Sequence, residues 1–264
     1  MTNLKEKFKS TGLYKSLRKA EQDARKHIKH LRLKSRLNKA DPVFIFQMGK
    51  VASSSVHHSL KKQYKGPVAH AHHIGSSNWA SEVIYDWFKQ GRKIKIISPV
   101  RDPIGYNISS FFQNFENITG TPFSQSKLST EELIQLFLEK NDHDKPLQWF
   151  DKNIKKHFDI DVYESTFHED GIMTYQKDNV SLLVFRIDIS DHDKEQAIKK
   201  FLDMPDFTLH NRNISSQKKY RNDYYEFKSR LKLPAEYLDK MRNSKFFNQF
   251  YSEEYIVNTL SQWK

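Results

Sequence analysis

The sequence predicts an α/β fold in which a mostly parallel sheet is covered by helices on both faces. Short apolar runs typical of buried strands alternate with longer segments that have the polarity of helices. The chain of 264 residues holds 35 aromatic residues, enough for a substantial core. Glycine and proline together contribute only 16 residues, which excludes a collagen-like or linker-dominated chain.

Four segments are predicted to be strands of this sheet, because each is a short apolar run next to polar or turn-forming residues. These segments are Val43–Phe46, Pro67–His72, Lys93–Val100 and Ser181–Ile187. Parallel sheets bind ligands at the carboxyl ends of their strands. The residues that follow each strand are therefore the first candidates for a functional site.

Helices are predicted between and after the strands. Asp102 is expected to cap a helix that starts at Pro103, and Ser129 forms a capping box with Glu132. Other predicted helices are Ser53–Gln63, a segment with the apolar face Trp79, Val83 and Trp87, Pro146–Phe158, Asp193–Leu202, and three helices after Gln217 that are separated near Pro234 and Ser252. The C-terminal third is thus expected to be helical.

The positive charge of the chain is concentrated at its N-terminus. Residues 1–40 carry 13 lysines and arginines but three acidic residues, which accounts for +10 of the total charge of +12. A stripe from Leu13 to Leu31 has helical spacing, so we expect a basic helical extension over 1–40 and a single domain over 41–264. The extension fits either a solvated helix or contact with an anionic membrane surface or polyanion. Only Phe8 and Tyr14 interleave aromatic rings among these charges, which argues against specific nucleic-acid recognition.

Several classes of protein are excluded by composition. The absence of cysteine rules out disulfides, thiolate metal sites, iron–sulfur clusters and a cysteine nucleophile. No apolar run approaches the ~20 residues of a membrane span, and the basic N-terminus lacks the apolar region of a secretory signal. We therefore expect a cytoplasmic protein. If the basic helix contacts an anionic membrane, that contact would lie at the inner face.

The segment after the first strand has the features of an anion-binding loop. Gly49 and Lys50 are followed by Val51 and Ala52, and the next helix begins at Ser53, Ser54 and Ser55. A helix N-terminus carries unpaired N–H donors and about half a positive charge, which favours phosphate or sulfate. The same pattern also fits an ordinary serine-rich helix start.

A second candidate anchor follows the third strand. Arg101 lies at its predicted end, and Ser109 follows eight residues later in the next helix. In a doubly wound sheet, the tips of these two strands lie close together, so Arg101 would offer its guanidinium to a second anionic group. Alternatively, Arg101 pairs with Asp102 on the surface and Ser109 faces solvent.

Together, these two motifs resemble those of carbohydrate sulfotransferases, which use PAPS (3′-phosphoadenosine 5′-phosphosulfate). Lys50–Ser55 is similar to the Lys-Val-Ala-Cys-Thr loop of the Golgi enzymes, and Val100–Pro103 with Ser109 resembles their second element. The resemblance covers about 20 residues and implies a P-loop-like fold. It implies that Gly49–Ser55 bind the 5′-phosphosulfate, with Lys50 at the bridging oxygen of the leaving phosphate, and that Arg101 and Ser109 bind the 3′-phosphate. Gly49 and Ser53 stand where the family has Pro and Cys.

A pair of histidines is a candidate for the base of the reaction. His70 and His72 alternate at the end of the second strand, so both point to the same side. Histidine suits proton transfer near neutral pH. The segment resembles the His-Gly-His element of uronosyl 2-O-sulfotransferases, which implies that His72 is the catalytic base and that His70 assists it. A structural pair, a metal site, or Glu82 or Asp86 as the base remain open.

A polar loop enters the C-terminal helices. Its residues Lys218, Lys219 and Tyr220 fit either a basic cover over the nucleotide, as in many sulfotransferases, or a solvated helix start. The aromatic residues that follow fit either a cover for the sheet or a wall of the acceptor groove.

The sequence thus predicts a metal-independent sulfotransferase that moves a sulfuryl group from PAPS to a carbohydrate hydroxyl and releases PAP, in capsule or surface-polysaccharide synthesis. One alternative is a nucleotide-dependent kinase with the same phosphate cradle, for which Asp188 is the candidate magnesium ligand. Another is a non-enzymatic, basic polyanion-binding protein.

Overall fold

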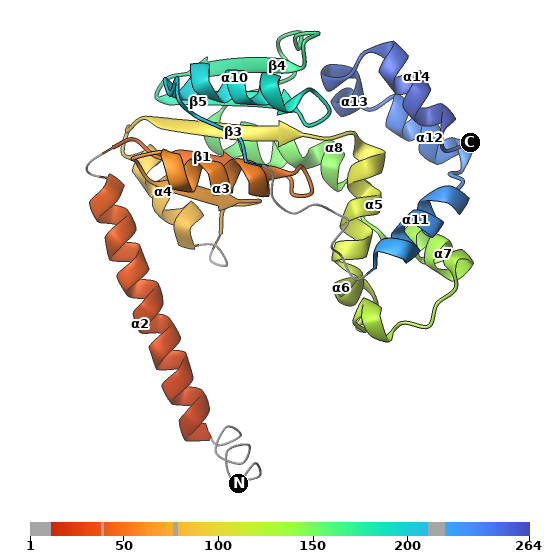
Figure 1. The fold of residues 1–264 in the computed structure, drawn as a ribbon, viewed down its shortest axis with the longest axis horizontal. Helices are drawn as coiled ribbons and strands as arrows, with labels where there is room; N and C mark the ends of the chain where they lie inside the picture. Colours follow the sequence, from red (N-terminus) through yellow and green to blue (C-terminus); the bar gives the residue numbers. More distant parts are fainter. Residues whose placement is uncertain (1–11, 38–39, 76–78, 211–219) are drawn as a thin grey trace.

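The protein is built around a five-stranded sheet with the strand order β2-β1-β3-β5-β4 (Figure 1). The computed structural model describes residues 12–37, 40–75, 79–210 and 220–264. The strands are β1 (Val43–Phe46), β2 (Val68–Ala71), β3 (Ile94–Val100), β4 (Ile172–Lys177) and β5 (Val180–Arg186). All neighbouring strands are parallel except β4 and β5. The predicted, mostly parallel α/β sheet is confirmed.

The edge strand β4 is the strand that the sequence did not predict. Its side chains are mostly exposed or half-buried, and only Tyr175 is buried. An edge strand with a solvated face lacks the continuous apolar run of a central parallel strand. β5, in contrast, is a central strand and has such a run, with Leu182–Phe185 all buried.

Side chains of the central strands alternate between two apolar layers. Val43 and Ile45 share one layer with side chains of α3 (Ser53–Gln63) and α10 (Asp191–Leu202). Phe44 and Phe46 share the other with side chains of α4 (Trp79–Lys89), α5 (Pro103–Gln113) and α8 (Lys145–Phe150). The sheet is therefore covered on both faces, as predicted.

Two predicted helix caps are present. The side chain of Asp102 accepts a hydrogen bond of 2.6 Å from the backbone N–H of Gly105 at the start of α5. Ser129 and Glu132 form the capping box of α7 (Thr130–Lys140). The remaining short elements of the middle region are α6 (Phe115–Thr119), a 3-10 turn (Phe123–Gln125), the π-helical segment η2 (Asp151–Lys155) and α9 (Lys156–Phe158).

Residues 220–264 form four helices, so the prediction of three is wrong. They are α11 (Arg221–Arg230), α12 (Ala235–Arg242), α13 (Lys245–Phe250) and α14 (Glu253–Ser261). The additional break comes at Ser244, whose side chain caps α13 by accepting from the N–H of Phe247 at 3.2 Å.

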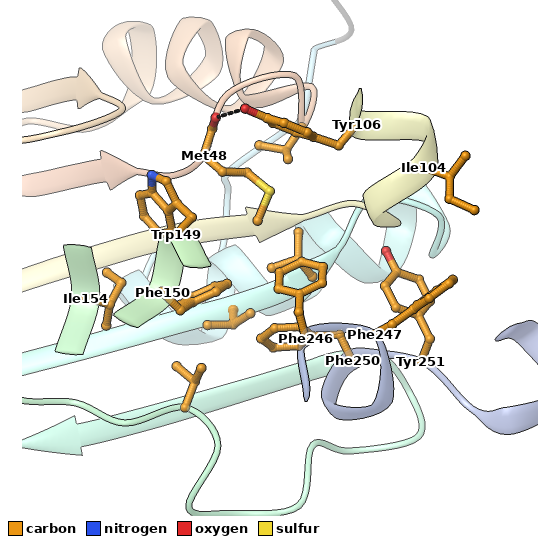
Figure 2. Packing of buried hydrophobic residues seen from close by; sticks show 14 of the residues in the cluster. Met48, Ile104, Tyr106, Trp149, Phe150, Ile154, Phe246, Phe247, Phe250 and Tyr251 are labelled. Carbon is orange, nitrogen blue, oxygen red and sulfur yellow. Dashed lines mark hydrogen bonds between the residues drawn. The ribbon is translucent and has the colours of Figure 1, made fainter. Parts of the chain in front are cut away.

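The aromatic residues of α13 belong to the core. Figure 2 shows Phe246 and Phe250 beside Phe150 of α8, with ring centres 6.2 and 5.2 Å from that of Phe150. Phe247 is also fully buried. These rings therefore cover the sheet, which decides between the two roles that the sequence left open for them.

The N-terminal helix α2 (Gly12–Leu37) extends away from the sheet (Figure 1). Near its end, Leu33 and Leu37 pack against Val83 and Trp87 of α4. Members of the stripe seen in the sequence are instead exposed: Leu17 by 57%, Ile28 by 49% and Leu31 by 54%. Within the described residues, none of the helices combines the length and apolarity that crossing a bilayer requires.

Candidate active site

The ends of three parallel strands bring the predicted site residues to one edge of the sheet. β1 pairs with β2 on one side and with β3 on the other, with Ile45 opposite both His70 and Ile97. The backbone N–H of Gln47 then extends this pairing by donating to the carbonyl of Ala71 at 3.2 Å. As a result, the loop after β1 lies beside the histidines of β2 and the start of α5.

The loop after β1 is a tight, left-handed turn. Gly49, Lys50 and Ala52 have φ values of 88°, 55° and 53°. Two of these residues are not glycine, and such a conformation costs of order 1 kcal/mol or more for each, which marks functional turns. The turn leads directly into α3, whose cap residue Ala52 provides no side-chain hydrogen bond to the helix. The helix N-terminus therefore faces the loop with N–H donors that no cap side chain satisfies.

A buried glutamine joins this loop to both candidate histidines. The amide nitrogen of Gln47 lies 2.9 Å from Ser53 Oγ, 3.0 Å from His70 Nε2 and 2.9 Å from His72 Nδ1. Its amide oxygen accepts a hydrogen bond from the N–H of Gly49. Ser53 Oγ also lies 2.9 Å from His70 Nε2. Gln47 thus fixes the loop and the two rings in one network.

Both histidines are neutral at pH 7. Burial, followed by the charges of His72 and His57, lowers the pKa of His70 to about 4. His72 is exposed at the pocket, and desolvation of its ring is the largest cause that lowers its pKa. The charges of His73, Lys145 and Lys50 act in the same direction. His72 Nδ1 lies 3.1 Å from the carbonyl oxygen of Gln47. In the tautomer whose Nδ1–H donates to that carbonyl, the amide of Gln47 cannot also donate to Nδ1 and donates to Ser53 and His70 instead. In that tautomer, Nε2 keeps a lone pair that can accept a proton.

Neighbouring helices brace the loop and the strand end from behind. The indole N–H of Trp149 in α8 donates to the carbonyl of His72 at 2.9 Å. The hydroxyl of Tyr106 in α5 donates to the carbonyl of Met48 at 3.2 Å, as the dashed line in Figure 2 shows. Both side chains are almost fully buried. Neither residue was singled out as a site residue from the sequence.

A pocket of about 440 Å³ opens at this edge of the sheet. Its walls come from the loop after β1 with the start of α3, the end of β2, α5 with the following Asn114, and the face of α8 and η2. Of the predicted site residues, those that line it are Gly49, Lys50, Ala52, Ser53, Ser54, His70 and His72. Val51 and Ser55 are buried beside the pocket without lining it. The Lys50 ammonium donates to the side-chain oxygen of Gln113 in α5.

Arg101 lies behind the loop, as the adjacency of the two strand tips predicts. Its Nη1 donates to the carbonyl of Lys50 at 3.4 Å, and its Nε lies 3.8 Å from a carboxylate oxygen of Asp102. Both Arg101 and Ser109 are half-buried and lie outside the pocket lining. Partial burial, together with the charge of Arg101, lowers the pKa of Lys228 in α11. Lys228 therefore adds a second positive charge near Arg101 that the sequence motifs did not reveal.

The C-terminal candidates are only partly visible. Lys218 and Lys219 lie outside the described residues. Tyr220 precedes α11 and stacks on Phe112 of α5, with 5.5 Å between ring centres. This places Tyr220 near the same helix as Ser109, away from the histidine pocket.

Comparison with known proteins finds a similarity over part of the chain. Residues 126–252 match the model of the NKWYS family, which is described as "Putative capsular polysaccharide synthesis protein". The match covers a little under half of the chain and includes the α8–η2 wall of the pocket, while the loop after β1, His70, His72 and Arg101 lie outside it. Neither the curated proteins nor the solved structures contain a significant match.

The lowered pKa of the half-buried His70 leads to a prediction about stability. The pKa of His70 falls from 6.5 to about 4 on folding. Between these two pH values, the unfolded chain therefore binds a proton at His70 that the folded protein does not bind. We expect a stabilisation of about 3 kcal/mol that is complete above pH 6.5 and is lost as the pH falls toward 4.

Urea unfolding of the His70→Gln variant between pH 4 and pH 7 measures this effect. The variant should show a flatter dependence of unfolding free energy on pH across that window than the wild type. Equal slopes for the two proteins would contradict the assignment of His70 as a half-buried histidine with a lowered pKa.

Proposed function

We propose that the protein transfers a sulfuryl group from PAPS to a hydroxyl group of a capsular or surface polysaccharide. The observation that carries the proposal is the meeting of a left-handed anion cradle and a neutral, oriented histidine in one pocket. The relation of residues 126–252 to capsular polysaccharide synthesis supports a carbohydrate acceptor.

The residues at the strand tips suit a donor with phosphate groups at both ends. Lys50, Ser54 and the uncapped N-terminus of α3 offer donors to a 5′-phosphosulfate. On the other side of the loop, Arg101, with Ser109 on α5, suits a 3′-phosphate. When bound, PAPS supplies an activated sulfuryl group.

Different residues of the pocket act as the base, stabilise the developing charge and position the base. His72 Nε2 accepts the proton of the acceptor hydroxyl, while the carbonyl of Gln47 and the indole of Trp149 hold the ring and its backbone in place. Lys50 and the N–H groups of α3 present positive charge to the side of the pocket where negative charge develops. Ser53 contributes by positioning, because its hydroxyl contacts Gln47 and His70.

The kinase alternative receives less support. Its candidate magnesium ligand, Asp188, is bound by Arg186 through contacts of 3.2 Å from Nε and 2.7 Å from Nη2. Asp188 also lies outside the pocket lining. An acid committed to a neighbouring arginine does not supply the ligand that this reading needs beside the phosphate cradle.

Calorimetric titration with PAP in the absence of divalent cations tests the proposal. We expect the wild type to bind PAP and Arg101→Ala to lose about 1–3 kcal/mol of binding free energy, because a charged hydrogen-bond donor is removed. Arg92→Ala is the matched control, because it also removes an arginine, but one outside the pocket. The guanidinium carbon of Arg92 lies 4.2 Å from the ring centre of Trp87. Magnesium-dependent ATP turnover without PAP binding would favour the kinase instead.

A further inference from the structure

One face of the helix formed by α8, η2 and α9 contributes a wall of the pocket. The side chains on this face are spaced three or four residues apart, as one helix face requires: Lys145, Gln148, Trp149, Lys152 and Asn153. The π-helical turn of η2 lies within this face, and such turns often occur at functional sites. The face lies within the segment that matches the polysaccharide-synthesis family.

Two lysines on this face are unpaired. Lys145 and Lys152 are exposed, and within the described parts of the chain neither forms an ion pair or side-chain hydrogen bond. Other lysines around the same helix are paired: Lys155 with Asp161, Lys240 with Asp144 and Lys245 with Asp151. Lys156 is likewise unpaired among the described residues, but it lies outside the pocket lining. Within the described parts of the chain, Lys145 and Lys152 are therefore the unpaired lysines of this helix that a ligand in the pocket can reach.

The charge of the pocket lining is positive. Lys50, Lys145 and Lys152 line it, whereas Asp142 is the single acidic residue among the described lining residues. Lys50 is held toward α5 by Gln113, so the positive charge of α8 and η2 stands separately on another wall. Lys145 and His72 line the same pocket, and the charge of Lys145 lowers the pKa of His72.

We propose that Lys145 and Lys152 bind a carboxylate of the acceptor, so that the acceptor is an acidic polysaccharide with uronate sugars. This rests on the proposed function, because it takes the hydroxyl presented to His72 as the sulfated group. A carboxylate held on the helix face would orient the acceptor sugar relative to His72 Nε2 and offset the positive charge of the pocket. The donor phosphates would then use the other wall, formed by the loop after β1 and α3.

Binding of uronate oligosaccharides to the PAP-loaded protein tests this inference. The probes are oligosaccharides of polygalacturonate, hyaluronan and heparosan, each compared with its carboxyl-reduced, neutral counterpart. We expect at least one acidic probe to bind about tenfold or more tightly than its neutral form. In a Lys145→Gln/Lys152→Gln variant, that preference should disappear while PAP affinity stays unchanged. A Lys140→Gln/Lys156→Gln variant removes the same charge from exposed positions outside the pocket and should keep the preference.

The outcomes separate this inference from the proposed function. Absence of PAP binding in the wild type would remove the proposed function itself. PAP binding without any preference for an acidic probe would overturn the inference alone, as would a preference retained in the Lys145→Gln/Lys152→Gln variant. Weaker PAP binding in that variant, with no change in acceptor preference, would assign the two lysines to the donor instead.

Discussion

Replacing His72 by alanine is expected to abolish sulfuryl transfer while leaving PAP binding intact. Removal of a positioned general base typically slows a reaction by about 10²–10⁴-fold. The contact that braces this strand end survives the substitution, because Trp149 donates to the backbone carbonyl of His72. Gln47 also retains its contacts with Ser53 and His70. The cradle should therefore keep its shape.

The pH dependence of turnover provides a second readout for His72. Because its pKa is lowered from 6.5, the neutral imidazole is the favoured form at that pH. The acidic limb of the turnover profile should therefore lie below pH 6.5, and activity should fall as the pH drops through the pKa of His72.

A radiolabelled PAPS assay with an accepted oligosaccharide measures turnover, and calorimetry measures PAP binding. His168→Ala is the control, since His168 is exposed and lies outside the pocket. Turnover by His72→Ala within a few fold of the wild type would remove His72 from its role. A loss of PAP binding together with turnover would show that His72 holds the cradle instead.

The central fold could be read from the sequence because its elements carry local signals. Val43–Phe46 is apolar at every position and leads into a helix that begins at the first of three serines. Asp102 and Ser129 act as caps through contacts with residues only three positions away. The edge strand β4 and the helix break at Ser244 escaped prediction, because neither has a continuous apolar run or a proline to mark it.

Site residues that directly follow a predicted strand could be found from the sequence. Site residues that depend on contacts between distant parts of the chain could not. His70 and His72 stand at the end of a predicted strand, so their shared direction followed from the alternation of side chains. Gln47 connects residues up to 25 positions away, and its only local mark is a polar side chain at the end of an apolar run. Lys145 and Lys152 become candidate ligand-binding residues only because α8 and η2 line the same pocket as the end of β2.

Replacing Lys50 by alanine is expected to weaken both PAP binding and turnover. The ammonium lines the pocket and is positioned by Gln113. Loss of a charge-assisted contact should cost about 1.5–3 kcal/mol of PAP binding free energy. Loss of charge stabilisation at the leaving side should reduce turnover by about 10²–10³-fold. The backbone is a minor factor, because lysine and alanine both meet the same penalty at a φ of 55°.

Calorimetry, the labelled-donor assay and thermal unfolding together measure these effects. Lys61→Ala serves as the control, since Lys61 is exposed near the far end of α3 and does not line the pocket. Wild-type PAP affinity and turnover in Lys50→Ala, with unchanged thermal stability, would remove the loop from donor binding.

The two substitutions should also be coupled through charge. Lys50 is one of the groups that lower the pKa of His72, so its removal should raise that pKa toward 6.5. The residual turnover of Lys50→Ala should then lose activity at a higher pH than the wild type as the solution is acidified. If the charge of Lys50 does not affect the pKa of His72, the acidic limb of the turnover profile will stay at the wild-type pH. The shift therefore tests whether the anion cradle and the base serve one reaction in one pocket.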